Sequence, residues 1–274
     1  MRQDRDVARA IERIRRENRR QWLVQGVSVV IIVIIIWWAV EGTGFSLRAT
    51  FRGIPNIVQF MWEDLLPPRL AATGRYLMPA LETLYMSYVA AVIAAFVSIG
   101  FGILGASNLV PNPVVRYGSR AVVSFLRAVP DVVWGVLLVG AVGIGPVAGV
   151  IALTLGAIGM LGKNFADAFE DIDPGQVEAV RATGANSVQV FLQGVWPQFV
   201  PAFISWSFYR FDLNIRSAAI VGVVGGGGIG FALITNIRLF QYQAASMGIL
   251  FIFGMILVIE YLTARSRDAI LGRE

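Results

Sequence analysis

Three long stretches without a charged residue constrain the fold of this chain more than any other feature. They cover residues 22–40, 83–115 and 132–162. A helix needs about 20 mainly apolar residues to cross the hydrocarbon core of a bilayer, so each stretch can hold at least one membrane span. The composition agrees, because 56% of the 274 residues are hydrophobic, only 15% are charged and the mean hydropathy is +0.67. The sequence therefore predicts an all-α integral membrane protein.

Helix-breaking residues divide these stretches into single spans. Pro111 and Pro113 end the second stretch, and a Gly-Ile-Gly-Pro turn at 143–146 divides the third. Two more apolar runs follow nearer the C-terminus. The sequence predicts about six transmembrane helices, at residues 22–40, 78–106, 121–142, 147–161, 199–220 and 239–259. The uncharged run at 217–237 is also long enough to span, so the limits of the fifth helix stay open.

Basic residues gather on one side of this layout. Residues 1–20 alone contain eight arginines, and others follow the second, fourth and sixth spans. Cytoplasmic segments of membrane proteins are enriched in Lys and Arg, so we expect both termini in the cytoplasm. The predicted segments are a cytoplasmic basic leader (1–21), a retained first anchor (22–40), an external loop (41–76), a helical core (77–263) that contains a cytoplasmic loop (163–198), and a cytoplasmic tail (264–274).

The absence of two residue types excludes several kinds of chemistry. The chain has no Cys and no His, so it has neither a Ser-His-Asp or Cys-His nucleophile system nor a histidine-based metal motif. Gly162 and Lys163 are followed by Asn164, and Ala157 stands where a phosphate-binding loop needs Gly. We therefore expect no enzyme, no metal site and no cofactor in this chain. The net charge of +5 does not indicate nucleic-acid binding, because the basic residues lie at membrane edges.

The polar loop before the fifth span has its own helix signals. Asp173 and Pro174 predict the start of a short helix, and Gly184 predicts a left-handed corner after it. A second helix, capped by Asn186 or Ser187, is expected to run to a break at Pro197. Apolar residues give the first helix a small surface that suits a shallow groove on another protein; they are Val177, Ala179, Val180 and Ala182.

This loop resembles the cytoplasmic signature loop of ABC-importer permeases. The matching residues are Glu178-Ala179-Val180, then Gly184 six residues after the glutamate, then Pro197 thirteen after the glycine. The pattern departs from the family at Val180, at Gly194 and at Trp196. The resemblance implies a type I ABC-importer permease core whose coupling helices dock on an ATPase subunit. An ordinary interfacial helical hairpin is the alternative interpretation of the motif alone.

A second stretch narrows the resemblance. Residues 210–217, Arg-Phe-Asp-Leu-Asn-Ile-Arg-Ser, and the glycine-rich residues 221–230 resemble phosphonate-importer permeases. This implies a homodimer in the bacterial plasma (inner) membrane. It also implies two ATPase subunits that bind ATP and Mg, and an extracytoplasmic substrate-binding protein. The implied substrate is phosphonate or a related phosphorus oxyanion such as phosphate or phosphite, and the sequence does not rank these.

Charged residues inside the predicted spans are candidates for the substrate pathway: Arg127, Asp131, Arg210, Asp212 and Arg216. Charges in a bilayer seldom face lipid, and guanidinium groups match oxyanions in geometry and charge. Arg127 with Asp131, and Asp212 with Arg216, are spaced four residues apart, so each pair can also form a purely structural ion pair on one helical face. Arg210 has no such neighbour.

The glycine run after the fifth span permits two interpretations. Glycines without side chains allow close helix packing, or a non-helical turn that serves as a gate or offers amides to an anion. The candidate gate residues are Gly225, Gly226, Gly227, Gly228 and Gly230. Glu82 in the second span is expected near the interface with a structural role.

A different class of function uses the same charges. A channel or an ion-coupled secondary transporter could conduct ions past the arginines and aspartates of the spans. The docking-type loop and the lack of a detectable inverted repeat argue against this alternative.

Overall fold

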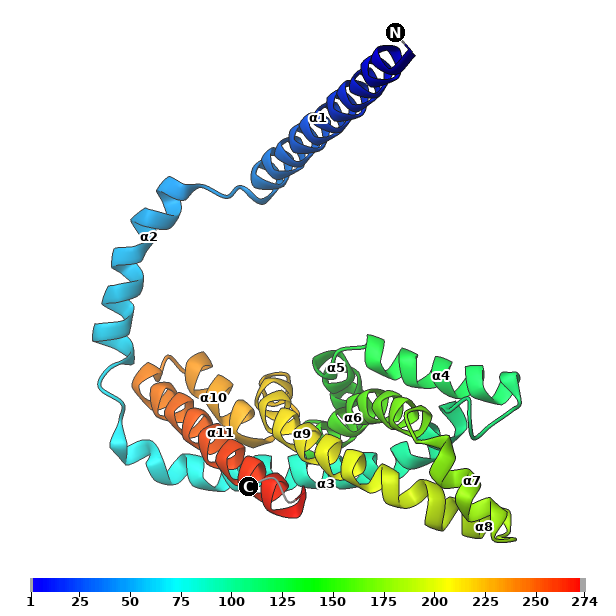
Figure 1. The fold of residues 1–274 in the computed structure, drawn as a ribbon. Coiled ribbons are helices and arrows are strands. Elements are labelled where there is room, and N and C mark those ends of the chain that lie inside the picture. Colours follow the sequence, from blue (N-terminus) through cyan, green and yellow to red (C-terminus); the bar gives the residue numbers. More distant parts are fainter. Residues whose placement is uncertain (1, 272–274) are drawn as a thin grey trace. The chain divides into compact units, whose positions relative to one another are not determined.

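The computed structural model describes residues 2–271, with side chains for residues 21–266. Within this range every regular element is a helix (Figure 1), and the chain forms two compact units, Met1–Glu63 and Asp64–Glu274. The α-helices are α1 (Arg2–Thr43), α2 (Leu47–Gln59), α3 (Thr73–Gly105), α4 (Pro113–Ala128), α5 (Asp131–Val142), α6 (Pro146–Glu170), α7 (Pro174–Ala182), α8 (Ser187–Val190), α9 (Trp196–Val223), α10 (Gly228–Arg238) and α11 (Tyr242–Leu271). Short π-helical and 3-10 segments are η1 (Phe60–Leu65), η2 (Leu70–Ala72) and η3 (Phe191–Val195).

The first unit is dominated by α1, which contains the anchor predicted at 22–40. The apolar part of this helix, Gln21–Thr43, is long enough to span a membrane, and none of its residues is buried within the structure. The expected leader, residues 1–21, is helical from Arg2 onward, and the side chains of residues 1–20 lie outside the described ones. α2 lies within the predicted external loop and begins after Ser46, whose hydroxyl accepts from the Ala49 amide.

The second unit is built on α3, which runs along its length (Figure 1), with α7 and α8 at one end and α10 and α11 at the other. α3 packs closely on α6 because small residues meet at the contact. A Cβ on Gly102 would lie 2.7 Å from that of Phe165, and Ala94 and Ala157 are fully buried. Close approach of helices through small residues is typical of membrane bundles.

An aromatic cluster joins the C-terminal end of α6 to the start of α9. Phe169 stacks on Phe199 with ring centroids 4.0 Å apart, and Phe165 meets Phe199 edge-on at 5.2 Å. All three side chains are fully buried, and Phe191 and Trp196 pack around them. The cluster holds α6 and α9 together at the base of the polar loop that connects them.

The third predicted span, 121–142, is not one straight helix. α4 ends at Ala128, α5 begins at Asp131, and their axes differ by 87°. Pro130 explains the break, because proline lacks an amide hydrogen and disfavours helical backbone at the residue before it. Five helical stretches of the described chain are long and apolar enough to cross a membrane, and the bent α4–α5 pair makes a possible sixth.

Several helices extend beyond the predicted spans. The second and fourth spans were expected at 78–106 and 147–161, but α3 begins at Thr73 and α6 continues to Glu170. The last span was expected at 239–259, and α11 starts at Tyr242 and continues to Leu271, into the expected tail; residues 272–274 lie outside the described range.

Pro197 does not break the chain as expected. The helical path continues from α8 through η3 into α9, with Pro197 in the first turn of α9. In η3 the Trp196 amide donates to the carbonyl of Phe191, five residues back. The wider π-helical turn ends just before proline, so a residue that cannot donate is accommodated without a corner.

Candidate functional site

The exposed loop between α6 and α9 forms as the sequence predicts at its first helix. The Asp173 carboxylate accepts from the Gly175 amide at 2.9 Å, and Pro174 opens α7. α7 ends at Ala182, and Gly184 follows with φ of +83°. Glycine reaches this left-handed conformation without the steric cost that other residues incur, so the corner depends on it.

The second helix of the loop is capped by Asn186, one of the two residues predicted. Asn186 Oδ1 accepts from the Gln189 amide, and Gln189 Oε1 accepts from the Asn186 amide, both at 2.9 Å. This reciprocal pair is a capping box. The two caps and the glycine corner give the helix–corner–helix shape without a large core.

The apolar surface of α7 is smaller than predicted. Val177 and Val180 are half-buried against η3, where a Cβ on Gly194 would lie 3.2 Å from the Val177 Cα. Ala179 and Ala182 remain exposed. Gly194, where the loop departs from the family pattern, thus has a local structural role. Glycine at this position lets α7 and η3 approach each other.

Two exposed apolar residues of the loop were missed by the sequence analysis. Val188 and Leu192 are 66% and 55% exposed. Their spacing of four residues places them on one helical face, which could have indicated a contact surface. Together with the exposed Glu178, Ala179 and Ala182 they give the loop a mixed apolar and acidic surface.

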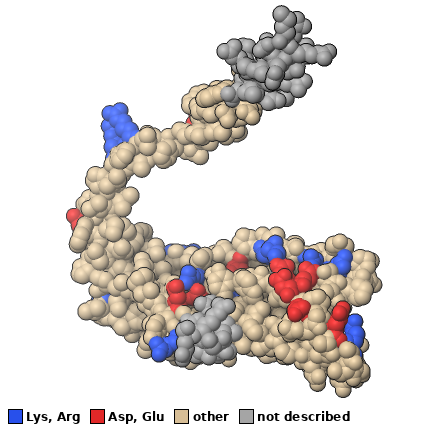
Figure 2. All heavy atoms as spheres, in the orientation of Figure 1, with Lys and Arg blue, Asp and Glu red and all other residues tan. Residues whose placement is uncertain are grey.

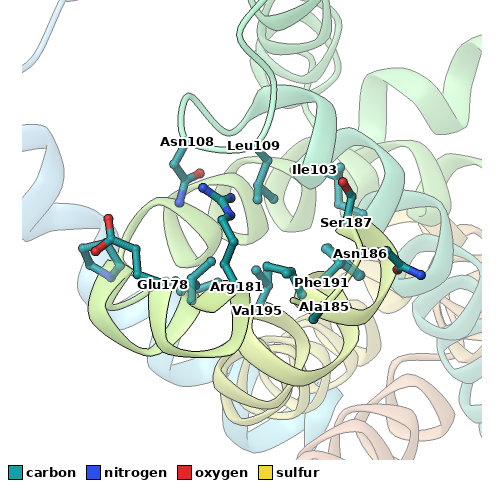
Figure 3. Close-up of a pocket in the computed structure, with 14 residues that line it drawn as sticks. Ile103, Asn108, Leu109, Glu178, Arg181, Ala185, Asn186, Ser187, Phe191 and Val195 are labelled. Carbon is teal, nitrogen blue, oxygen red and sulfur yellow. The ribbon is translucent and has the colours of Figure 1, made fainter. Parts of the chain in front are cut away.

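A cavity of about 720 Å³ lies between this loop and the turn after α3. In Figure 3 Arg181 extends across it toward Asn108 and Leu109, whereas the carboxylate of Glu178 points away from Arg181. Asn108 Nδ2 donates to the carbonyl of Phe169 at 2.6 Å, which fixes the turn on the end of α6. The cavity lining is mainly apolar, and its charged residues are Glu178 and Arg181 of α7.

The pairing of Arg127 with Asp131, which their spacing allowed, does not form. The 87° bend separates the two residues, and Asp131 pairs instead with Arg210 on α9, whose Nη2 lies 3.2 Å from Oδ2 and 3.4 Å from Oδ1. The side chains are only 18% and 8% exposed. Gly156 on α6 makes room for them, since a Cβ there would collide with the Asp131 carboxylate.

The pairing of Asp212 with Arg216 is confirmed, at 3.0 Å. Arg216 also contacts Glu260 on α11 at 3.1 Å. The sequence analysis missed Glu260, which lies 44 residues further on and at no helical spacing from Arg216. Of the predicted pathway residues, the structure thus brings Asp131 together with Arg210, and Asp212 with Arg216.

Arg127 stands apart from these pairs. Its side chain is exposed, and within residues 21–266 it makes no ion pair or side-chain hydrogen bond. An arginine at the centre of a membrane helix costs about 2.5–3.5 kcal/mol on insertion scales when it faces lipid. Among the predicted pathway residues, Arg127 is thus the one without a charged partner within residues 21–266.

The glycine run breaks the helical path between α9 and α10. Gly225, Gly227 and Gly228 have φ of +104°, +82° and +67°. Gly226 and Gly230 lack space for a side chain, because a Cβ would collide with Val221 and with the Ala219 carbonyl, respectively. Close packing and a non-helical turn therefore occur together.

Glu82 and Thr83 of α3 hold the start of α10. Glu82 Oε1 accepts from the Gly228 amide at 3.1 Å, and Thr83 Oγ1 accepts from the Ile229 amide at 2.8 Å. These are amides of the first turn of a helix, which have no partner within the helix. Glu82 has a structural partner, as expected, and that partner is the glycine turn.

A membrane-embedded helical bundle that presents a capped helix pair at one end has the architecture of a transporter's membrane subunit. Residues 98–270 match the family described as "Binding-protein-dependent transport system inner membrane component". This match covers more than half of the chain, and the chain belongs to that family.

Curated relatives include a Mycolicibacterium smegmatis protein named "Phosphate-import permease protein PhnE", 44% identical over 77% of this chain. The match spans only 39% of that relative's length. The "Phosphite transport system permease protein PtxC" of Stutzerimonas stutzeri is 36% identical over 87% of both chains. These relatives do not favour the channel or ion-coupled alternative.

A solved structure has the same fold. It is titled "Inward facing conformations of the MetNI methionine ABC transporter: CY5 native crystal form", with a TM-score of 0.64, covering 71% of this chain and 95% of that chain. At 20% identity it supports the fold alone.

Proposed function

We propose that this chain is the permease subunit of an ATP-driven importer for a phosphorus oxyanion such as phosphonate, phosphite or phosphate. Two copies form the pathway, and an extracytoplasmic binding protein delivers the substrate. Two ATPase subunits, which bind ATP and Mg, dock on the loop between α6 and α9. The subunit resides in the bacterial inner membrane with both termini in the cytoplasm.

The observation that carries this proposal is the capped loop itself. Glu178 and Ala179 are exposed on α7, Gly184 forms the left-handed corner, and Val188 and Leu192 add an apolar surface on the following helix. A helix pair without a core of its own, held by caps and by the aromatic cluster at its base, suits insertion into a groove on a partner. A movement of the ATPase subunit would be transmitted directly to α6 and α9, because the loop connects these two helices.

The substrate class rests on two kinds of support. The relatives named above carry phosphate and phosphite in their names, and the chain matches one of them over 87% of its length. Arginines within the membrane-spanning part provide groups that complement oxyanions. Because one relative is named for phosphate and the other for phosphite, they support phosphorus oxyanions as the substrate class and do not distinguish between these two ions.

The substrate class is tested by ATP hydrolysis of the purified complex with its binding protein. Phosphite, phosphate and methylphosphonate are compared with sulfate and methionine as stimulants. We expect at least one phosphorus oxyanion to raise the hydrolysis rate several-fold above the rate with sulfate or methionine. Stimulation by methionine alone, or by none of the phosphorus compounds, would contradict the proposal.

A further inference from the structure

A second, smaller cavity lies between α3, α4 and α6, separate from the loop cavity. Its volume is about 140 Å³. Six of its lining residues have polar or charged side chains: Ser119, Arg120, Ser124, Arg127, Lys163 and Asp167. Figure 2 shows basic side chains spaced along α4 with acidic ones beside them. Three cations and one carboxylate line the cavity, so its wall is net positive.

Most of these polar groups already have partners. Arg120 donates to Glu170 and to the Gly105 carbonyl, and Lys163 pairs with Asp167. The Ser119 hydroxyl donates to the Phe101 carbonyl.

Two side chains of the cavity differ from the rest. Within residues 21–266 Arg127 and Ser124 make no side-chain hydrogen bond or ion pair, and both are exposed. They lie three residues apart on α4, which places them on one face of the helix. This cavity therefore contains a guanidinium group and a hydroxyl group that are free to bind a ligand.

The position of Arg127 along the span indicates where this cavity leads. Gly159 packs on the Arg127 backbone, since a Cβ there would lie 2.5 Å from the Arg127 nitrogen. Gly159 lies eleven residues before Glu170, the end of α6. At about 1.5 Å per residue this is roughly 16 Å along α6. The cavity thus extends along α6 from Arg127 toward the α6 end that continues into the loop.

The chemistry of the cavity fits a small tetrahedral anion. A guanidinium binds such an oxyanion through two parallel N–H donors, and a neighbouring hydroxyl can donate a third hydrogen bond. A cavity of about 140 Å³ has room for a phosphate-sized ion. Asp167 and Glu170 keep the local field moderate, which suits a site that must release its ion.

We propose that this cavity is a transient binding site for the transported phosphorus oxyanion on the inner half of the pathway. Arg127 and Ser124 contact the anion, and Lys163 and Arg120 support it as nearby charges. Among the three membrane arginines, this assigns substrate contact to Arg127, because Arg210 and Arg216 are already paired. The inference rests on the proposed function, since the substrate class comes from there.

The test measures two quantities on the assembled complex in nanodiscs of phosphatidylcholine. The first is equilibrium binding of radiolabelled phosphate to the permease–ATPase complex without the binding protein, and the second is uptake in proteoliposomes. Variants are Arg127→Ala, Arg127→Lys and Ser124→Ala. Arg116→Ala is the control, because Arg116 lies on the same helix outside the cavity, over the ring of Tyr117 at 5.0 Å.

We expect Arg127→Ala to lower both binding and uptake at least tenfold, Ser124→Ala to lower them several-fold, and Arg127→Lys to restore part of the loss. Arg116→Ala should match the wild type. Complex yield on size exclusion is measured for each variant, so that loss of assembly is not mistaken for loss of the site. Wild-type uptake in both Arg127→Ala and Ser124→Ala would overturn the site.

Two further outcomes distinguish failure of the proposed function from failure of the proposed anion site. If the wild type transports no phosphorus oxyanion, the proposed function fails and this inference fails with it. The headgroup of an anionic lipid has the same phosphate chemistry. If phosphatidylglycerol co-purifies with the wild type and not with Arg127→Ala while their phosphate uptake is equal, the cavity is a lipid site and the inference is wrong.

Discussion

Arg210 in the middle of α9 contacts Asp131 at the first residue of α5, across 79 residues of sequence. The two side chains are largely buried, and Met160 Sδ lies 3.8 Å from Nη1 of Arg210. This ion pair ties the bent part of the third span to the fifth. Arg210 therefore has a charged partner in the structure, although spacing within its own helix indicated none.

Removal of Asp131 should therefore destabilise the bundle. Asp131→Ala leaves a buried guanidinium without its counter-charge, and breaking a buried pair in this way costs about 3–5 kcal/mol. We expect a lower thermal unfolding temperature in detergent. The double variant Asp131→Ala with Arg210→Ala should be more stable than Asp131→Ala alone, because neither charge is left unpaired. Equal stability of the two variants would contradict the pairing.

The space that Gly156 leaves for this pair gives an independent prediction. Gly156→Ala adds a methyl group where the Asp131 carboxylate lies, so it should lower the unfolding temperature and reduce assembly. Gly140→Ala on α5 is the matched control, because no atom lies within 4 Å of a Cβ there. Differential scanning fluorimetry compares the two variants, and indistinguishable unfolding curves would argue against the packing described.

The loop corner at Gly184 should govern ATPase docking. Gly184→Val forces a β-branched residue into a left-handed conformation, which costs about 1–2 kcal/mol or turns the helices away from their partner. Glu178→Arg reverses the exposed charge of α7. We expect both variants to insert in the membrane and to lose ATPase co-purification at least fivefold.

Asp171→Arg provides the control for the loop variants, because Asp171 is exposed at the loop entrance outside the motif. It should retain the ATPase. Normal co-purification with both Gly184→Val and Glu178→Arg would place the docking surface elsewhere.

Glu82 and Thr83 should hold the glycine turn against opening. Thr83→Val removes the acceptor of the buried Ile229 amide, and an unsatisfied buried group costs about 1–3 kcal/mol. Glu82→Gln keeps an acceptor oxygen and Glu82→Ala does not. Hydrogen exchange of the peptide spanning 225–231 should accelerate in Thr83→Val and Glu82→Ala and stay near wild type in Glu82→Gln.

Thr154→Val is the control for this exchange measurement. The Thr154 hydroxyl donates only within its own helix, to the Val150 carbonyl, so its loss should leave the peptide unchanged. Equal exchange in all four variants would mean that α3 does not hold the turn.

Local signals explain what the sequence predicted well. Asp173, Pro174, Gly184 and Asn186 act through hydrogen bonds and dihedral angles of their immediate neighbours, so the loop could be derived residue by residue. The apolar runs likewise located the helices of the membrane part, and their ends were the main errors. Pro130 was a visible signal for the bend that the sequence analysis did not use.

Long-range relationships could not be derived in this way. The partner of Asp131 depends on how α5, α6 and α9 pack, and Glu260 reaches Arg216 only because α11 lies against α9. The small cavity at Arg127 depends on three helices at once. Spacing within one helix gave the wrong partner for Asp131 and the correct one for Asp212, because only the second pair lies on an unbroken helix.

Uptake in proteoliposomes tests the central claim most directly. The permease, its ATPase and its binding protein are reconstituted together, and accumulation of a labelled phosphorus oxyanion is followed with ATP, without ATP, and with an imposed proton gradient in its place. The account predicts accumulation that requires ATP and all three components and is abolished by Gly184→Val. Accumulation by the permease alone, driven by the proton gradient without ATP, would contradict it.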